Sequence, residues 1–276
     1  MAGKDFAERS IRGALTFFRE AIFADETAGL PGVLQSLDPR VKIVMVLLGL
    51  LLVLFTRSLA VLGVLYLLSV LLAAVSRIKL GSFLKRTWIF IPLFSLLIAI
   101  PAMFSFVSPG ESILSAGAFH ITRQGVMSAG FFVGRVLASV SLVVLLSMTT
   151  RHFDLLKALR CFGIPHLFVM VLGMCYRYLY LFVEMVENTH RAIKSRVGSR
   201  IHYRKGQRVV AWNIAHLWMR SYAMNEQVYH AMVSRGFRGE PVALDRFRTR
   251  PRDWCWLLAA VAVMLLLGYV EHRTRA

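Results

Sequence analysis

Long apolar runs separated by short polar stretches make up most of the first half of the chain. The runs cover about Val41–Thr56, Leu59–Val75, Thr87–Val107 and Val126–Met148. Each is close to the roughly 17–25 residues that an α-helix needs to cross a bilayer. A fifth run, Trp254–Val270, lies near the C-terminal end. The pattern predicts an all-α polytopic membrane protein with about five transmembrane helices, the first two of them joined as a tight hairpin.

Two features mark the start of the first run and the course of the third. Asp38 is suited to the N-cap of a helix, and Pro39 to its first position, where no N–H is needed. Pro92 and Pro101 fall inside the third run, and we expect kinks there. We treat residues 37–148 as a four-span transmembrane region, and residues 254–276 as the final span with its tail.

The N-terminal segment, residues 1–36, is mixed in composition and is predicted to be interfacial or cytoplasmic. Within Phe6–Ala24, apolar residues recur at helical spacing among polar ones that include Arg12 and Arg19. This pattern suits a helix lying in the headgroup region. Packing of the same apolar face against the rest of the protein fits the pattern equally well.

Basic residues collect between the fourth and fifth runs. Residues 149–253 contain 18 Lys and Arg against 7 Asp and Glu, a balance of +11 within a chain of net charge +18. Basic loops of membrane proteins stay on the cytoplasmic side. Ser108–Gly125, by contrast, carries only Glu111 and Arg123 and suits the outside. We therefore predict a cytoplasmic N-terminus, a cytoplasmic lobe at residues 149–253, and Glu271–Ala276 outside.

The basic region contains patterns for three helices. A short one covers about Thr149–Cys161 and ends at Phe162-Gly163-Ile164-Pro165. Two long ones cover about His166–Arg196 and Gln207–Arg235. The apolar stretch Leu167–Val183 is long enough for a transmembrane helix. If it crossed the membrane, however, the basic residues that follow it would lie outside. We therefore expect a cytoplasmic or interfacial helix.

Both long helices finish with the same short sequence. Ala-x-x-Ser-Arg closes each of them, with the last two positions at Ser195-Arg196 and at Ser234-Arg235-Gly236. A cation near a helix C-terminus is favoured by the helix dipole, so one such arginine carries little information. Two copies on two long helices suggest a pair of docking tips. An arginine there can bind a partner's carboxylate or carbonyls in a fork.

The sequence carries none of the common catalytic or nucleotide-binding motifs. We find no G-x-x-x-x-G-K-[ST], H-E-x-x-H, C-x-x-C or G-x-S-x-G, and the first four runs hold no Asp, Glu or His. That argues against an intramembrane hydrolase or a proton-driven carrier. His202, His216 and His230 are spaced too widely to share a metal. No catalytic, cofactor or metal site is expected, and Cys161, Cys175 and Cys255 are expected to be buried free thiols.

Arg135 stands near the middle of the fourth run. A charge at that depth costs on the order of 2.5–3.5 kcal/mol on insertion scales, and the first four runs contain no carboxylate to pair with it. The guanidinium could be stabilised by backbone carbonyls, by a polar cavity, or by an intramembrane contact with another subunit.

Several of these features together resemble the transmembrane T component of energy-coupling-factor (ECF) ABC transporters, in the cobalt/nickel-type CbiQ branch. The resemblance covers roughly residues 34–253. It departs from the family at the first tip, where Val197 follows Arg196 in place of glycine. The matching pieces are Leu37-Asp38-Pro39-Arg40-Val41-Lys42, Arg135, Thr149-Thr150, Phe162-Gly163-Ile164-Pro165, Met174-Cys175-Tyr176-Arg177-Tyr178 and the two Ser-Arg tips.

The resemblance implies a non-catalytic coupling subunit of an importer in the inner (plasma) membrane, surrounded by membrane lipid. Its two arginine-tipped helices would dock on a pair of ABC-type ATPases, with Ser195, Arg196, Ser234, Arg235 and Gly236 as the docking residues. ATP would be bound by those partners, and no cofactor by this chain. A separate substrate-binding membrane subunit would take up cobalt or nickel, although a vitamin is also possible.

Two other classes compete with this interpretation. A membrane-anchored module that binds nucleic acid would explain the basic region, but its Tyr, Trp and Met stripes are more typical of packed helices than of a stacking platform. Nucleic acid is therefore not an expected partner. An integral-membrane enzyme would need a polar cluster near the interface, where only scattered His and Glu are available.

Overall fold

The computed structural model describes residues 32–88, 94–95, 97–99, 112–116, 119–197, 203–239 and 249–275. These residues fall into two compact units. We call the part within 25–155 and 247–276 the membrane unit, and the part within 156–246 the lobe unit. The predicted helix Phe6–Ala24 and most of the predicted span Thr87–Val107 lie outside the described residues. The division into domains by side of the membrane stays a prediction.

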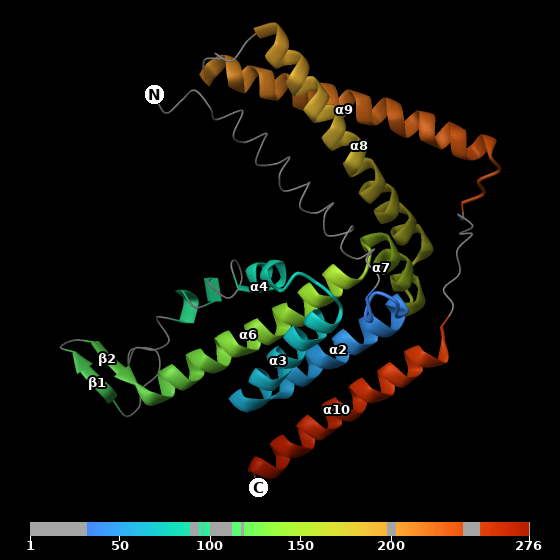
Figure 1. Cartoon of the computed structure of the whole chain (residues 1–276). Coiled ribbons are helices and arrows are strands. Elements are labelled where there is room, and N and C mark those ends of the chain that lie inside the picture. Colours follow the sequence, from blue (N-terminus) through green and yellow to red (C-terminus); the bar gives the residue numbers. More distant parts are fainter. Residues whose placement is uncertain are drawn as a thin grey trace. The chain divides into compact units, whose positions relative to one another are not determined.

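The membrane unit is built around a helical hairpin and two longer helices. Helix α6 contacts both arms of the hairpin, and α10 contacts its first arm (Figure 1). A shorter helix, α4, follows the hairpin and also packs on α6. The bounds are α2 Pro39–Phe55, α3 Leu59–Val75, α4 Leu80–Trp88, α6 Arg123–Thr149 and α10 Pro251–Arg275. The spans predicted at the positions of α2, α3, α6 and α10 are confirmed as helices.

The first helix begins and ends where its sequence indicates. The Asp38 side chain accepts the N–H of Arg40 at 3.0 Å, and Pro39 occupies the first turn. Thr56 closes α2, with its hydroxyl bound to the carbonyl of Leu52 at 2.7 Å. Each arm of the hairpin has 17 residues, about 25 Å at 1.5 Å per residue. The hairpin is therefore slightly shorter than the ~30 Å hydrocarbon core of a bilayer.

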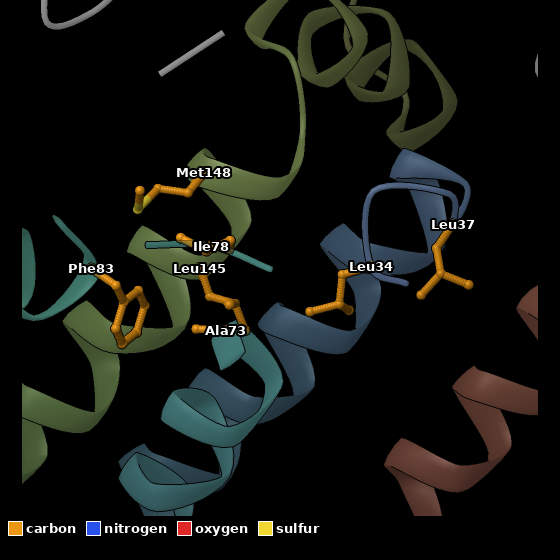
Figure 2. Packing of buried hydrophobic residues seen from close by; sticks show 7 residues of the cluster. All are labelled: Leu34, Leu37, Ala73, Ile78, Phe83, Leu145 and Met148. Carbon is orange, nitrogen blue, oxygen red and sulfur yellow. The ribbon is translucent and has the colours of Figure 1, made fainter. Parts of the chain in front are cut away.

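Two clusters of buried apolar side chains hold the membrane unit together. Figure 2 shows one of them, where the turn before α2, the end of α3, α4 and the end of α6 meet. Phe83 of α4 is fully buried there. A second cluster joins the hairpin to α6 and α10 through Val53, Leu62, Ala138 and Leu267, among others. Many outward apolar side chains stay exposed, as expected for helices whose surroundings are lipid. They include Leu51, Leu54, Phe55, Leu67, Leu71, Leu258, Leu265 and Leu266.

Gly49 allows α2 to approach α6 closely. A Cβ at this position would lie 3.0 Å from Cδ1 of Leu142. We expect Gly49→Leu to lower the free energy of unfolding by about 1–3 kcal/mol, because the inserted side chain over-packs this contact. Gly63→Leu in α3 is the matched control, since nothing lies within 4 Å of a Cβ there. Thermal unfolding in detergent measures both, and equal midpoints would contradict the expectation.

A short β-hairpin precedes α6, within the linker Ser108–Gly125 between the third and fourth predicted spans. Strand β1 (Ser112–Ala116) pairs antiparallel with β2 (Phe119–Thr122). Backbone pairing between two segments close in sequence is enough to form so short a ladder, which the hydrophobic pattern did not predict. The all-α class is confirmed for the body of the protein, with this hairpin as an addition.

The lobe unit is built mainly from two helices of 32 residues each, α8 (His166–Val197) and α9 (Tyr203–Ser234). They are preceded by α7 (His152–Leu159), which begins in the membrane unit, and by the 3₁₀ turn Arg160–Phe162. Gly163 follows with φ of +84°, a left-handed conformation that glycine adopts without the cost of a Cβ. The predicted short helix, its glycine break and both long helices are confirmed.

By length and composition, three described helices can cross a membrane: Arg123–Thr149, Pro251–Arg273 and the first part of α8, His166–Thr189. The result agrees with a multi-pass helical membrane protein. The cytoplasmic or interfacial placement of Leu167–Val183 stays a prediction.

Candidate coupling site

Helix α9 ends in a glycine-capped turn. The N–H of Phe237 donates to the carbonyl of Met232 at 3.0 Å, and the N–H of Gly236 donates to that of Val233 at 2.9 Å. These two bonds form a Schellman motif, in which the residue after the C-cap is left-handed. Gly236 is that residue, with φ of +82°. The glycine therefore stops the helix, whose last residue is Ser234, and Arg235 is left exposed at the tip.

The tip of α8 has the same Ser-Arg pair. Ser195 Oγ donates to the carbonyl of Ala192 at 2.8 Å, and in α9 Ser234 Oγ donates to that of His230 at 2.9 Å. Both hydroxyls are therefore bound to their own helix, and Arg196, like its counterpart, is the exposed group. Residues 198–202 lie outside the described residues, so the course of the chain after Val197 is not included in the site.

The two tips share a chemistry suited to binding acidic or carbonyl groups. Each presents a guanidinium, a planar fork of N–H donors, beside the terminal carbonyls of a long helix. The helix stiffens the position of the arginine, which lowers the entropy lost when a partner is bound. The structure therefore supports the predicted geometry of two arginine tips, while their docking role stays a prediction.

One face of α9 carries large apolar side chains that nothing in the described chain covers. Their exposed fractions run from 59% to 78%, whereas Leu217, Met224 and Met232 of the same helix are half-buried. The sequence indicates a packed stripe here, and the described residues do not supply its packing partner. Helical spacing reveals an apolar face but not what covers it. The exposed residues are Trp212, Trp218, Met219, Tyr222 and Tyr229.

Arg135 lies at the tip of the helical hairpin. Its Nη2 donates to the carbonyl of Thr56 at 3.0 Å, which confirms contact with a backbone carbonyl. Next to that carbonyl, the N–H of Arg57 donates to Oε1 of Glu271, a side chain only 7% exposed. Glu271 belongs to α10, which places it beside the hairpin; its position outside the membrane stays a prediction. An intersubunit contact of Arg135 stays a prediction.

A second polar cluster is buried at the opposite end of α2. Lys42 is 4% exposed, and its Nζ donates to the carbonyl of Thr149 at 3.1 Å and to Oγ1 of Thr150 at 3.2 Å. Asp38 and Asp253 are also buried, and both attract the lysine electrostatically. Asp38, Lys42 and Thr149-Thr150 lie in segments that resemble the family, but the sequence does not show that they meet. Lys42 is more than 100 residues from Thr149 and Thr150, so no local sequence pattern indicates their contact.

The cysteines and histidines form no site among the described residues. Cys161, Cys175 and Cys255 are free but exposed, so the expectation of buried thiols is wrong. They lie on helix faces that no other described element covers. His216 and His230 are exposed, and His202 lies outside the description. Within the described part, no three His, Cys, Asp or Glu side chains gather as metal ligands.

These observations define a multi-pass helical membrane protein that presents two arginine-tipped helices and an uncovered apolar face. The CbiQ family model, described as cobalt transport protein, matches residues 32–244. The chain therefore belongs to the CbiQ family. The resemblance to transmembrane T components, stated above on motifs, is confirmed.

Two relatives match most of this chain, and a third matches just under half of it. An uncharacterized protein of Methanocaldococcus jannaschii is 30% identical over 263 residues, covering 94% of this chain and 90% of the relative. The energy-coupling factor transporter transmembrane protein EcfT of Streptococcus thermophilus is 26% identical over 255 residues, 86% of this chain and 94% of the relative. The nickel permease LarQ of Lactiplantibacillus plantarum is 30% identical over 126 residues, 45% of each chain.

Proposed function

We propose that this chain is the non-catalytic coupling subunit of an ECF-type ABC importer. On this proposal, ATP is bound and hydrolysed by separate ATPase subunits, and this chain holds no cofactor. Its movement would reorient a separate substrate-binding membrane subunit. The observation that carries the proposal is the pair of exposed arginines, Arg196 and Arg235, at the ends of α8 and α9. Membership of the CbiQ family gives these tips a context in transport.

The tips would dock on a pair of ABC-type ATPases. A guanidinium bound in a fork by carboxylates or carbonyls gives strong and directional contacts. The serines would shape the ends of the helices, since their hydroxyls are bound to their own backbone. Gly236 would fix the direction in which the second arginine leaves its helix.

The uncovered faces of the lobe unit would contact the substrate-binding subunit. Met219 is 74% exposed, and Met170, Met174 and Met232 lie half-buried on the same two helices. Methionine is adaptable in shape and suits an interface whose two sides move past each other. Large aromatic side chains such as Trp212 and Trp218 would supply most of the buried apolar area.

The cargo we propose is cobalt or nickel. Support comes from the family's description as a cobalt transport protein and from the name of the relative LarQ, a nickel permease. We place the protein in the plasma membrane with its N-terminus and basic region in the cytoplasm, because basic segments are retained there. This orientation also puts both arginine tips on the side where ATP is available.

Affinity purification of the tagged chain from its native membranes tests the proposal. We expect ABC-type ATPases and one further small membrane protein to be recovered in stable amounts, and an equally tagged unrelated multi-pass protein to recover neither. Addition of ATP with vanadate should keep the ATPases bound. If the solubilised chain is intact and recovers no ATPase, the proposed function is wrong.

A further inference from the structure

The buried cluster around Lys42 lies where the chain connects the two units. Thr149 ends α6 and Thr150 follows it, a few residues before the chain enters the lobe unit at residue 156. Both residues accept hydrogen bonds from Lys42 Nζ, at 3.1 and 3.2 Å. The outgoing connection is therefore tied to the start of α2.

The returning connection is tied to the same place. The chain re-enters the membrane unit at residue 247, and Asp253 follows in the first turn of α10. Its Oδ1 accepts the N–H of Asp38 at 3.4 Å, and its Oδ2 accepts the N–H of Arg250 at 2.8 Å. Asp253 is 3% exposed and Asp38 6% exposed. Hydrogen bonds thus link both chain connections to the start of α2.

We propose that these five residues form a joint that carries movement of the lobe unit into the membrane unit. We call them the α2 joint: Asp38, Lys42, Thr149, Thr150 and Asp253. The proposal rests on the proposed function, in which ATPases move the lobe unit. The proposal gives Lys42 the role of holding both chain connections at the start of α2. Neither the arginine tips nor the family comparison indicates this role.

The physical chemistry of the cluster favours a stiff connection. A buried ammonium ion must keep its partners, because solvent cannot replace them. Asp154, in the first turn of α7, attracts Lys42 together with Asp38 and Asp253. The attraction therefore extends along the outgoing connection into α7. Displacement of either connection would separate opposite charges in a low-dielectric site, so we infer that α2 follows the connections when they move.

Two neighbouring threonines provide a matched pair of variants. Thr150→Val keeps the side-chain shape and removes the hydroxyl that accepts from Lys42. Thr149→Val makes the same change one residue earlier, where the hydroxyl donates to the carbonyls of Leu145 and Leu146 in its own helix. The carbonyl of Thr149, which binds Lys42, remains in both variants. A difference between the two variants therefore reports the tie to Lys42.

The readout is the distance between nitroxide labels on Cys175 of α8 and Cys255 of α10. Cys161 is replaced by serine in every protein that is labelled, so that only these two thiols carry a label. Both labelled thiols are exposed, and they lie in different units. Pulsed electron paramagnetic resonance on the complete complex in lipid nanodiscs gives the distance distribution before and after ATP with vanadate. This measurement needs no knowledge of the cargo.

We expect the wild type and Thr149→Val to give a narrow distribution that ATP with vanadate shifts as a whole. In Thr150→Val the tied state should lose roughly tenfold in population, as for one hydrogen bond to a charged group. The distance distribution of Thr150→Val should therefore be broader than that of the wild type, and ATP with vanadate should shift only part of it. Identical distributions in both variants would overturn the joint while leaving ATPase binding, and so the proposed function, intact.

Two further outcomes are decisive. If Thr150→Val fails to assemble, Thr150→Ser, which restores the hydroxyl, must restore assembly and the narrow distribution; otherwise the joint is overturned. If the wild-type chain recovers no ATPase, the proposed function fails and the joint falls with it.

Discussion

The double variant Arg196→Glu/Arg235→Glu is expected to lose its ATPase partners almost completely. An interface arginine that acts as a hot spot contributes about 2 kcal/mol or more. The two tips belong to different helices, so their effects should add. A loss of about 4 kcal/mol corresponds to a roughly thousandfold weaker complex. Glutamate adds repulsion where the partner is acidic. Co-purification of the ATPase with the tagged chain, quantified against the wild type, measures the loss.

The control must change charge equally without touching the tips. Arg160→Glu/Arg220→Glu meets this need, because both arginines are exposed in the lobe unit and neither ends α8 or α9. We expect this control to keep its ATPase. Single tip variants should each be intermediate. Equal loss in the control would show that the net positive charge of the lobe unit binds the ATPase, and the assignment of the tips would then be wrong.

Most of the helical architecture could be predicted because its signals are local. Apolar runs of fixed length predict membrane helices, and they located α3, α6 and α10 to within a few residues. The Asp38-Pro39 pair predicted the start of α2, and the Gly163 break predicted the end of the short helix before α8. Each of these features depends on neighbouring residues alone.

What covers an apolar face could not be predicted, since periodicity gives the face but not its partner. Trp212 and Met219 are therefore exposed where packing was expected, and the three cysteines are exposed for the same reason. The β-hairpin before α6 was missed because its two strands are short.

The candidate site divides in the same way. The Ser-Arg tips could be found because a repeated pattern at two helix ends is visible in the sequence. The cluster around Lys42 could not, because it joins residue 42 to residues 149, 150 and 253. Only the packing of α2 between α6 and α10 brings them together. Glu271 is a similar case, since its place beside the hairpin depends on the path of α10.

Replacement of that lysine by an apolar residue of similar length is expected to destabilise the membrane unit strongly. Lys42→Met removes a buried positive charge that the buried carboxylates of Asp38 and Asp253 attract. Loss of one partner from a buried charge pair typically costs about 3–5 kcal/mol. In a unit of this size the unfolding midpoint should fall by roughly 10 °C. Thermal unfolding of the purified chain in detergent measures the change.

Two further variants separate lost charge from lost packing. Lys79→Met makes the same substitution at an exposed lysine of the same unit and should leave the midpoint unchanged. Lys42→Met/Asp38→Asn also removes a buried carboxylate, and asparagine caps a helix as well as aspartate does. We expect this double variant to recover part of the lost stability, because fewer uncompensated charges stay buried. If it is no more stable than Lys42→Met alone, electrostatic attraction is not what holds the start of α2 to α6 and α10.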